Sequence, residues 1–438
     1  MNYVTDIVHK LINPIKSGLF KPITHQIYAT ELSWLLGLKY LPIITMMENV
    51  WEKLVYAPED KQLEQYQTFL NNLSQSQEPL IRSIYTQATT HLSLPQLIVL
   101  IDTLTQLPAL STEVLGEVYE RFITLCHYEE KHNPNIILPR ALVDMLVIVT
   151  QPRYEEILLD PRANIGQFLV AADQYLRATT ENLSFTEQWS FLSHVRGMEA
   201  DLHLQRFALL NCAFHGIPTQ KTLVVIQENS LFANWNRADV IFANLLFTPQ
   251  AENVNHALTL LQQVMQYLNP NGRAVLIIAD EVLQVGGVAQ QVRKQLLDTC
   301  IVHTVLRLPQ GCFYPHNITA HVLFFYKSEA SEKTERIWFY DLRQGIPSFS
   351  HYVRLTREDL VAFEKTYGND PWGKERQCSP EDEATHYCYW ADRNQLEQEQ
   401  LDFQTTSISE ENTFDIWKTL DSSVEELEAL TTFLKTSK

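Results

Sequence analysis

An alternation of strand-like and helix-like runs most constrains how this sequence can fold. From about residue 154, short apolar runs rich in β-branched residues alternate with runs of helical spacing. This pattern predicts a mostly parallel sheet with helices on both faces. We expect strands at residues 156–159, 195–198, 222–226, 239–243, 274–279 and 302–306, and helices at residues 168–179, 201–215, 251–268 and 288–299.

Two further strand-like runs follow at residues 320–326 and 336–341. They are separated mainly by the polar stretch Ser-Glu-Ala-Ser-Glu-Lys. A short polar connection is typical of neighbouring antiparallel strands. The spacing therefore predicts an antiparallel hairpin that closes one edge of the sheet.

The periodicity also divides the chain into three parts. Residues 1–110 show helical spacing without strand alternation, which predicts an all-helical N-terminal domain. Ser111 is a suitable cap for a helix that begins near Glu113. The α/β domain is expected at residues 111–345. Residues 346–438 are expected to form a C-terminal tail, whose apolar helix at 424–434 packs either on its own domain or on a partner.

The charge of the chain limits how it would contact nucleic acid. The formal net charge of the 438 residues is −18. A protein that grips a phosphate backbone unaided is usually basic on at least one face. We therefore expect any contact with DNA to be made through a complex, although acidity that merely favours solubility is the simpler interpretation. We expect no membrane association, because no apolar run is long enough to span a bilayer.

The cysteines indicate a cytoplasmic protein. Six are scattered along the chain, which favours reduced thiols over a disulfide framework. The N-terminus also lacks the basic segment and apolar core of a secretion signal. Cys378, His386 and Cys388 lie close together but lack the paired spacing of a zinc site. We therefore predict no metal site.

Four loops follow the expected strands, at the sheet edge where doubly wound folds bind ligands. Residues 160–169 read Asp-Pro-Arg-Ala-Asn-Ile-Gly-Gln-Phe-Leu, and residues 244–247 read Asn-Leu-Leu-Phe. Between them come Glu199 and the pair Asn229 and Ser230. Together these loops resemble the adenine-specific DNA methyltransferases, and above all the modification subunit of type I restriction–modification systems, over roughly residues 113–345.

This resemblance implies a definite architecture and cofactor. The fold would be a class I methyltransferase-like, doubly wound α/β domain. It would have a mostly parallel seven-stranded sheet with an antiparallel edge hairpin, preceded by the all-helical domain. The cofactor would be S-adenosyl-L-methionine. The resemblance places Asp160, Gly166, Glu199 and Asn229 at its cofactor-binding positions, with Glu199 toward the ribose and Asn229 toward the adenine.

The cofactor loop departs from the family pattern Asp-Pro-Ala-Cys-Gly-Thr-Gly-Gly-Phe-Leu. Asn164 and Gln167 stand where that pattern has glycine, which lets a backbone turn sharply and approach a ligand closely. Asn164 can still adopt a left-handed conformation, but Gln167 puts bulk where the cofactor would lie. Glu199 is alternatively only an exposed charge before a helix, and Asn229 an ordinary turn residue.

The target-base loop departs as well. The family has Asn-Pro-Pro-Phe or Asn-Pro-Pro-Tyr, in which the asparagine oxygen and a proline carbonyl accept bonds from the target amino group and the aromatic ring stacks on the flipped base. The resemblance makes Asn244 and Phe247 the catalytic positions. Both prolines, which rigidify the loop, are replaced, by Leu245 and Leu246. We expect these leucines to pack inward as core residues.

A third departure precedes the α/β domain. Residues 135–140 read Asn-Ile-Ile-Leu-Pro-Arg, where the family has Gln-Phe-Tyr-Thr-Pro-Arg in an element that closes over the cofactor. Three ligand-facing elements are therefore altered while the surrounding scaffold persists. This asymmetry predicts a catalytically degenerate methyltransferase subunit with a structural or regulatory role in a DNA-modification or defence complex. Its partners would be an active methyltransferase subunit and a DNA-specificity subunit.

Two other functions remain open from the sequence. An active adenine methyltransferase with a divergent cofactor loop is the alternative, and Asn244 and Phe247 would then act on the target base. A stand-alone acidic protein that mimics DNA is a third possibility. It would leave the methyltransferase-like loops unexplained, and we rank it last.

Overall fold

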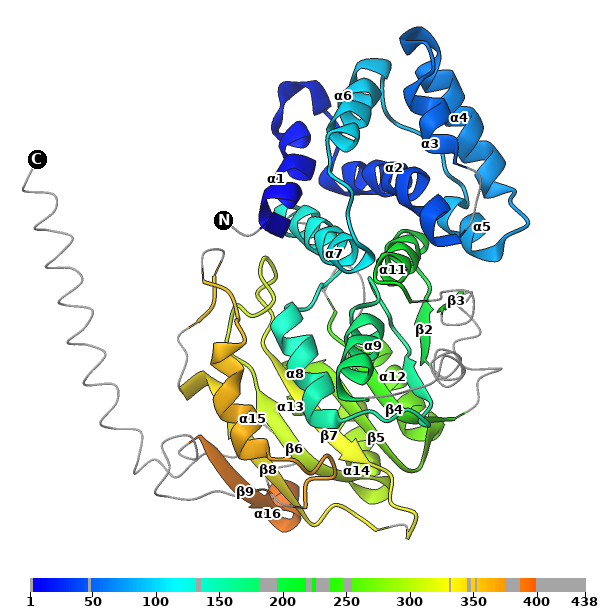
Figure 1. Ribbon diagram of the computed structural model, residues 1–438. Helices are drawn as coiled ribbons and strands as arrows, with labels where there is room; N and C mark the ends of the chain where they lie inside the picture. The colour runs from blue at the N-terminus through cyan, green and yellow to red at the C-terminus, as the bar shows by residue number, and fades with distance from the viewer. Residues whose placement is uncertain are drawn as a thin grey trace, which may run out of the picture.

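The computed structural model describes twelve stretches of the chain: residues 3–45, 49–130, 135–180, 195–217, 223–225, 237–247, 254–330, 332–344, 348–350, 353–374, 376 and 387–398. Helices α1 to α7 gather at one end of the molecule, and the sheet with its covering helices forms the other (Figure 1). The expected C-terminal helix at 424–434 lies outside the described residues.

The N-terminal part is helical, as the periodicity predicts. Ser111 caps α7 by accepting a hydrogen bond from the Val114 amide at 3.4 Å, which confirms the predicted helix start. Ser93 and Gln96 form a capping box at the start of α6. The elements are α1 (Tyr3–Lys16), the 3-10 turn η1 (Gly18–Phe20), α2 (His25–Thr45), α3 (Val50–Val55), α4 (Glu59–Ser74), α5 (Pro79–Tyr85), α6 (Leu94–Thr105) and α7 (Thr112–Glu129).

Helix α7 joins the two parts of the molecule. Its buried side chains, among them Leu115, Tyr119 and Phe122, belong to the core of the N-terminal helices. The same core takes in Phe207 and Phe214 of α11 (Leu202–Phe214), which lies between the helical domain and the sheet (Figure 1). The helical domain is therefore packed tightly onto the α/β domain. The boundary at residue 110 stays a prediction.

The described part of the chain contains one nine-stranded sheet, in the order β3-β2-β1-β4-β5-β7-β6-β8-β9. The mixed, mostly parallel α/β fold is confirmed, but the sheet has nine strands where the resemblance implies seven, and β9 has no counterpart among the runs that the sequence marks as strands. The strands are β1 (Leu158–Asp160), β2 (Val195–Glu199), β3 (Leu223–Val225), β4 (Ala238–Asn244), β5 (Leu268–Ala279), β6 (Ile301–Arg307), β7 (Ala320–Tyr326), β8 (Arg336–Asp341) and β9 (Cys388–Asp392).

The predicted hairpin between β7 and β8 is wrong, although both strands have the predicted bounds. β7 runs antiparallel between β5 and β6, and β8 pairs parallel with β6 on the other side. The reason is burial: six of the seven residues of β7 are buried, on both faces of the sheet. A strand that is apolar on both faces is typical of an interior position. The antiparallel partner of β8 is instead β9, which comes much later in the chain.

Helices cover both faces of the sheet (Figure 1). On one face, α8 (Arg140–Thr150), α9 (Gln167–Thr179) and α15 (Val361–Tyr367) share a hydrophobic core with the strands. On the other face, α12 (Val254–Tyr267), α13 (Asp280–Gln284), α14 (Val288–Thr299) and α16 (Arg393–Gln398) share a second core. Two short 3-10 turns, η2 (Leu342–Gln344) and η3 (Glu358–Leu360), complete the described elements.

The cysteines depart in part from expectation. Cys126, Cys212, Cys300 and Cys312 are free and buried. Cys388, however, is disulfide-bonded, so the expectation of reduced thiols is wrong at that position. Within the described ranges, no cluster of histidine, cysteine and carboxylate residues is suited to a metal ion. None of the described helices is sufficiently long and apolar to traverse a bilayer.

Candidate functional site

The sheet brings three of the predicted site residues to one edge. β1 pairs in parallel with β2 on one side and with β4 on the other. Asp160 ends β1, Glu199 ends β2 and Asn244 ends β4. Because the carboxyl ends of parallel strands meet at one edge, these three side chains lie around the same loops. Asn229, the fourth strand-end residue, lies outside the described residues.

The loop after β1 keeps the sharp turns of a glycine-rich loop. Gly166 has a φ of 78° and Asn164 a φ of 52°, both in the left-handed region. Asparagine tolerates that region better than most residues do, so the predicted conformation of Asn164 is confirmed. A Cβ at Gly166 would lie 3.3 Å from the Cys212 sulfur and 3.5 Å from the Ala208 backbone, which shows how closely α11 approaches this turn.

Glu199 is bonded to the backbone on both carboxylate oxygens. Its Oε2 accepts a hydrogen bond from the Asn164 amide at 2.8 Å, and its Oε1 accepts one from the Asp201 amide at 3.0 Å. The side chain is buried, so the interpretation as an exposed charge is wrong. The oxygens that the resemblance directs toward a ribose are therefore engaged by the protein's own N–H groups.

The two strand-end carboxyls are also desolvated. Burial raises the pKa of Glu199 to about 7, against the opposing effect of its two amide hydrogen bonds. Burial likewise raises the pKa of Asp160 to about 8, although Asp160 accepts a bond from the Arg162 amide. Asp160 is 1% exposed and Glu199 7% exposed, so both carboxyl groups have little contact with solvent.

The carboxamide of Asn244 is bonded within the chain on both of its polar atoms. Its Nδ2 donates to the Ile136 carbonyl at 3.1 Å. Its Oδ1 accepts from the Leu246 amide, also at 3.1 Å. A proline at position 246 has no N–H to donate. The change from proline to leucine therefore supplies the donor that occupies the asparagine oxygen.

The two leucines of this loop pack inward, as the sequence predicts. Leu245 and Leu246 are fully buried and join the cores on opposite faces of the sheet. The Leu245 amide also donates to the Ile277 carbonyl at 2.8 Å, which continues the pairing of β4 with β5. Phe247 is half-buried and packs against both cores. Core packing therefore holds this loop in place, whereas in the family pattern two prolines rigidify it.

Arg162 connects the first loop to the fourth. Its Nη1 donates to the Leu246 carbonyl at 2.7 Å and lies 3.5 Å from the Asn244 carbonyl. The Arg162 side chain therefore bonds the first loop to the backbone of the fourth.

Residues 135–139, which we call the closing segment, lie across both loops. Ile136 and Leu138 are buried, and the Ile136 carbonyl accepts from Asn164 Nδ2 and Asn244 Nδ2, each at 3.1 Å. The Gln167 side chain forms two hydrogen bonds with the same segment. Its Oε1 accepts from the Leu138 amide at 3.2 Å, and its Nε2 donates to the Leu138 carbonyl at 3.0 Å. The closing segment is therefore bonded directly to the first and fourth loops.

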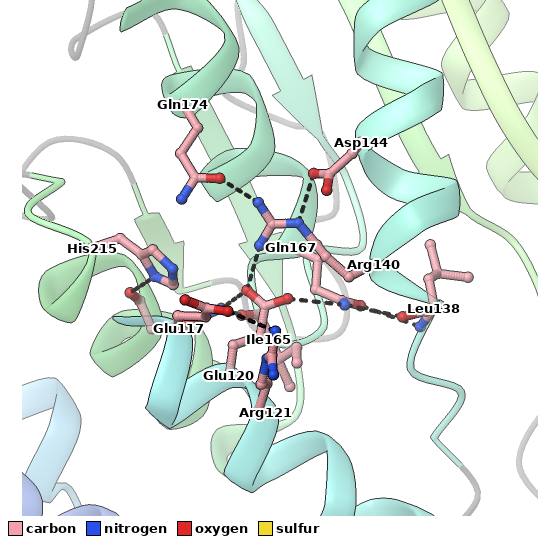
Figure 2. A network of polar contacts seen from close by, with 11 residues as sticks. Glu117, Glu120, Arg121, Leu138, Arg140, Asp144, Ile165, Gln167, Gln174 and His215 are labelled. Atoms are coloured by element: carbon pink, nitrogen blue, oxygen red, sulfur yellow. Dashed lines mark hydrogen bonds and ion pairs between the residues drawn. The ribbon is translucent and has the colours of Figure 1, made fainter. Parts of the chain in front are cut away.

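Sequence reasoning missed Glu120, which connects α7 to the starts of α8 and α9 and to α11 through Arg140, Gln167 and Asn211. It is buried on α7, where it accepts from Arg140 Nη1 at 2.9 Å, Gln167 Nε2 at 3.4 Å and Asn211 Nδ2 at 3.3 Å (Figure 2). Burial acts to raise its pKa, but nearby Arg140 and His215 hold the pKa below the usual range. The one sequence signal that could have identified Glu120 is that it is a single carboxylate on the apolar face of a predicted helix.

Comparisons with known proteins agree with this geometry. A family model described as N-6 DNA Methylase matches residues 110–414. The methylase subunit of the type I restriction enzyme EcoKI from Escherichia coli (strain K12) is 28% identical over 409 residues, covering 83% of this chain and 76% of that protein.

Solved structures of such subunits have the same fold. The crystal structure of the EcoKI M protein aligns with a TM-score of 0.54 and 25% identity, over 91% of this chain and 88% of that one. A chain from a type I R-M system, solved for its complex assembly and conformational transition, aligns with a TM-score of 0.75 and 20% identity. That alignment covers 99% of this chain and 97% of the other.

Proposed function

The chain belongs to the N-6 DNA methylase family, and we propose that within it the protein is a non-catalytic modification subunit. It would have a structural or regulatory role in a type I restriction–modification-like complex. The observation that carries this proposal is the state of Asn244. Its Nδ2 is bonded to the Ile136 carbonyl and its Oδ1 to the Leu246 amide, so the group expected to position a target base is committed within the chain.

The free energy needed to open this site supports the proposal. Lifting the closing segment breaks the bonds from Asn164 and Asn244 to Ile136 and the paired bonds between Gln167 and Leu138. Each such bond contributes about 0.5–1.5 kcal/mol, and the segment's buried aliphatic side chains would be exposed as well. A cofactor would have to offset all of these losses before it gained affinity.

The residues present do not fit S-adenosylmethionine. Both oxygens of Glu199 are bonded to backbone amides. Gln167 stands where the family has glycine and is bonded to Leu138, and Ile136 of the closing segment is buried and bonded to the first and fourth loops. We therefore assign no chemical step to this cofactor.

The proposed partners are an active methyltransferase subunit and a DNA-specificity subunit, and DNA would be contacted through that complex. The family supports this, because its relatives are methylase subunits of type I restriction enzymes. The net charge of −18 supports it further, since an acidic subunit depends on a basic partner to approach a phosphate backbone. A complex that modifies DNA would work in the cytoplasm.

Calorimetry with S-adenosylmethionine tests the proposal. The purified chain is titrated alone and in a complex isolated from its native host, and each sample is assayed for transfer of labelled methyl groups to adenine in DNA. We expect the chain to give no binding isotherm. We also expect any methylation by the complex to survive Asn244→Ala and Phe247→Ala. Micromolar binding by the chain, together with methylation abolished by Asn244→Ala, would sink the proposal.

One observation favours the alternative of an active enzyme. Asn164 and Gly166 both keep left-handed backbone conformations, so the outline of the cofactor loop survives. If the closing segment opened when a partner or DNA docked, the loop would need no refolding. The labelled-methyl assay on the complex separates the two functions, because an active subunit would lose activity on substitution of Asn244 and a non-catalytic one would not.

A further inference from the structure

A polar network joins α7 to the closing segment without passing through the strand ends (Figure 2). Its members Glu120, Gln167 and Leu138 are buried and line a cavity of about 660 Å³, whose walls come mainly from α1, α7, α8 and α9. Glu120 is on α7, Gln167 is the first residue of α9, and Leu138 belongs to the closing segment. Gln167 therefore lies between a carboxylate on α7 and the backbone that covers the loops.

Glu120 acts in this network only as an acceptor. Burial acts to raise its pKa, but Arg140 and His215 hold the pKa below the usual range, so the carboxylate is ionised. An ionised carboxylate has no hydrogen to donate. Its Oε2 accepts from Arg140 Nη1 at 2.9 Å and from Asn211 Nδ2 at 3.3 Å. These two bonds fix the carboxylate, and its Oε1 accepts from Gln167 Nε2 at 3.4 Å.

The carboxamide of Gln167 can be placed in two ways, which differ by exchange of its oxygen and its nitrogen. In the orientation adopted, Oε1 accepts from the Leu138 amide at 3.2 Å and Nε2 donates to the Leu138 carbonyl at 3.0 Å. The same Nε2 donates to Glu120. In the reverse orientation the oxygen would face a carboxylate and a carbonyl, and the nitrogen would face the Leu138 N–H. Glu120 therefore favours the orientation in which Gln167 holds the closing segment.

We propose that Glu120 is a positioning residue, which keeps the closing segment in place by orienting the carboxamide of Gln167. The other buried side chains of α7 belong to the core of the N-terminal helices. Closure over the first and fourth loops therefore depends on the seating of α7, and a partner that displaced α7 would release the segment. This inference rests on the regulatory role proposed above and names the helix through which such regulation would act.

Hydrogen exchange of the full chain, followed by NMR or by mass spectrometry of overlapping peptides, tests the proposal. The variant Glu120→Gln keeps the shape of the side chain but has one oxygen in place of two. Arg140 and Asn211 take that oxygen, so the new amide nitrogen faces Gln167 Nε2 and two donors meet. Exchange of the Leu138 amide should then accelerate by about ten-fold, whereas exchange of amides within β5 and β7 should change little.

Glu117→Gln is the matched control. Glu117 lies three residues earlier on α7, lines the same cavity and pairs with Arg121 at 2.7 Å. Its substitution therefore removes the same charge from the same helix and leaves the acceptor of Gln167 intact. We expect the closing segment to exchange as in the wild type. Acceleration equal to that of Glu120→Gln would reduce the effect to charge alone and would overturn the proposal.

Two other results would also contradict it. Equal acceleration in the closing segment and in β5 and β7 would mean that Glu120 only stabilises the fold as a whole. Unchanged exchange of the Leu138 amide in folded Glu120→Gln protein would mean that Glu120 does not position Gln167. Should this variant not fold, Glu120→Asp gives the same readout, because it keeps the charge and withdraws the carboxylate from Gln167 by one methylene group.

A double substitution identifies the route. Gln167→Ala removes the carboxamide through which Glu120 acts, so adding Glu120→Gln to it should change exchange of the Leu138 amide by less than about two-fold. A further ten-fold acceleration, roughly that of Glu120→Gln alone, would show that Glu120 acts by another route. These readouts are separate from the calorimetry. Binding of S-adenosylmethionine by the chain would contradict the proposed function and would leave the exchange results unaffected.

Discussion

Replacing Asp160 with asparagine tests whether the strand ends are as dry as the structure makes them. Asp160 is 1% exposed, and its Oδ1 accepts from the Arg162 amide at 3.1 Å. Burial raises its pKa from 3.8 to about 8. Asparagine has nearly the same shape and keeps an oxygen acceptor for that amide, but it cannot ionise. The substitution therefore removes the titration and leaves the packing.

The sign of the effect follows from the raised pKa. The folded protein keeps its proton on Asp160 up to about pH 8, whereas the unfolded chain loses it near pH 4. The contribution of this group to stability is therefore fully present below about pH 4 and is lost as pH rises toward 8. The loss is about 1.4 kcal/mol per pH unit, or on the order of 3 kcal/mol between about pH 5 and pH 7. Asp160→Asn lacks this loss.

Urea unfolding followed by tryptophan fluorescence measures the difference. The free energy of unfolding is measured for both proteins at about pH 5, 6 and 7. The value for Asp160→Asn minus the value for the wild type should rise by about 3 kcal/mol between about pH 5 and pH 7. Glu199, whose pKa is about 7, titrates in both proteins, and its charge contributes to the raised pKa of Asp160, so the comparison is cleanest at about pH 5 and 6. Asp102→Asn, at an exposed position on α6, serves as the control and should follow the wild type. Parallel curves for Asp160→Asn and wild type would mean that the carboxyl is hydrated, and the inference of a closed site would fail.

Three substitutions probe the remaining contacts. Gln167→Ala loses two bonds to the Leu138 backbone, so unfolding should cost about 2 kcal/mol less and amide exchange in the closing segment should accelerate; unchanged exchange would mean that Gln167 does not restrain the segment. Leu245→Ala leaves a core cavity and should destabilise by about 2–5 kcal/mol in urea unfolding, whereas a loss under about 1 kcal/mol would place this side chain outside the core. Gly311→Ala puts a Cβ 2.1 Å from the Phe349 carbonyl oxygen at a φ of 80°, so the melting temperature should fall clearly; a wild-type value would show that this contact is not made.

Sequence periodicity predicted most helices and strands well, because the spacing of apolar residues along a short stretch determines which kind of element it forms. The helix at Val288–Thr299 and the strand at Ala320–Tyr326 have the bounds that periodicity gives. β5 begins at Leu268, well before its expected start, because residues 269–273 read Asn-Pro-Asn-Gly-Arg and carry no strand signal. The neighbours of β7 were mispredicted for a different reason. A run that is buried on both faces indicates an interior strand but does not say which strands flank it.

The candidate site was predicted at the level of residue types but not of bonds. The substitutions at Asn164, Gln167 and Leu246 marked the altered loops, and steric bulk seemed sufficient to explain them. The structure instead bonds Asn164 and Gln167 to backbone groups more than 25 residues away, at Ile136 and Leu138, and bonds the Leu246 amide to the side chain of Asn244. Backbone partners are the same at every position, so no residue type in the sequence identifies them. Glu120 was missed for another reason: its partners are the side chains of Arg140, Gln167 and Asn211, which lie 20 to 91 residues away in the sequence.

The shared carbonyl of Ile136 has an evolutionary consequence. Restoring proline at position 246 alone would take away the N–H that Asn244 uses, and would leave a buried amide oxygen without its donor. Restoring glycine at position 164 alone would remove one of the two amides that Ile136 accepts. Each single reversion is thus penalised in stability before any catalytic benefit appears. Each of these two positions therefore helps to hold the loops in their closed arrangement, and a family-like residue at either one alone should loosen it.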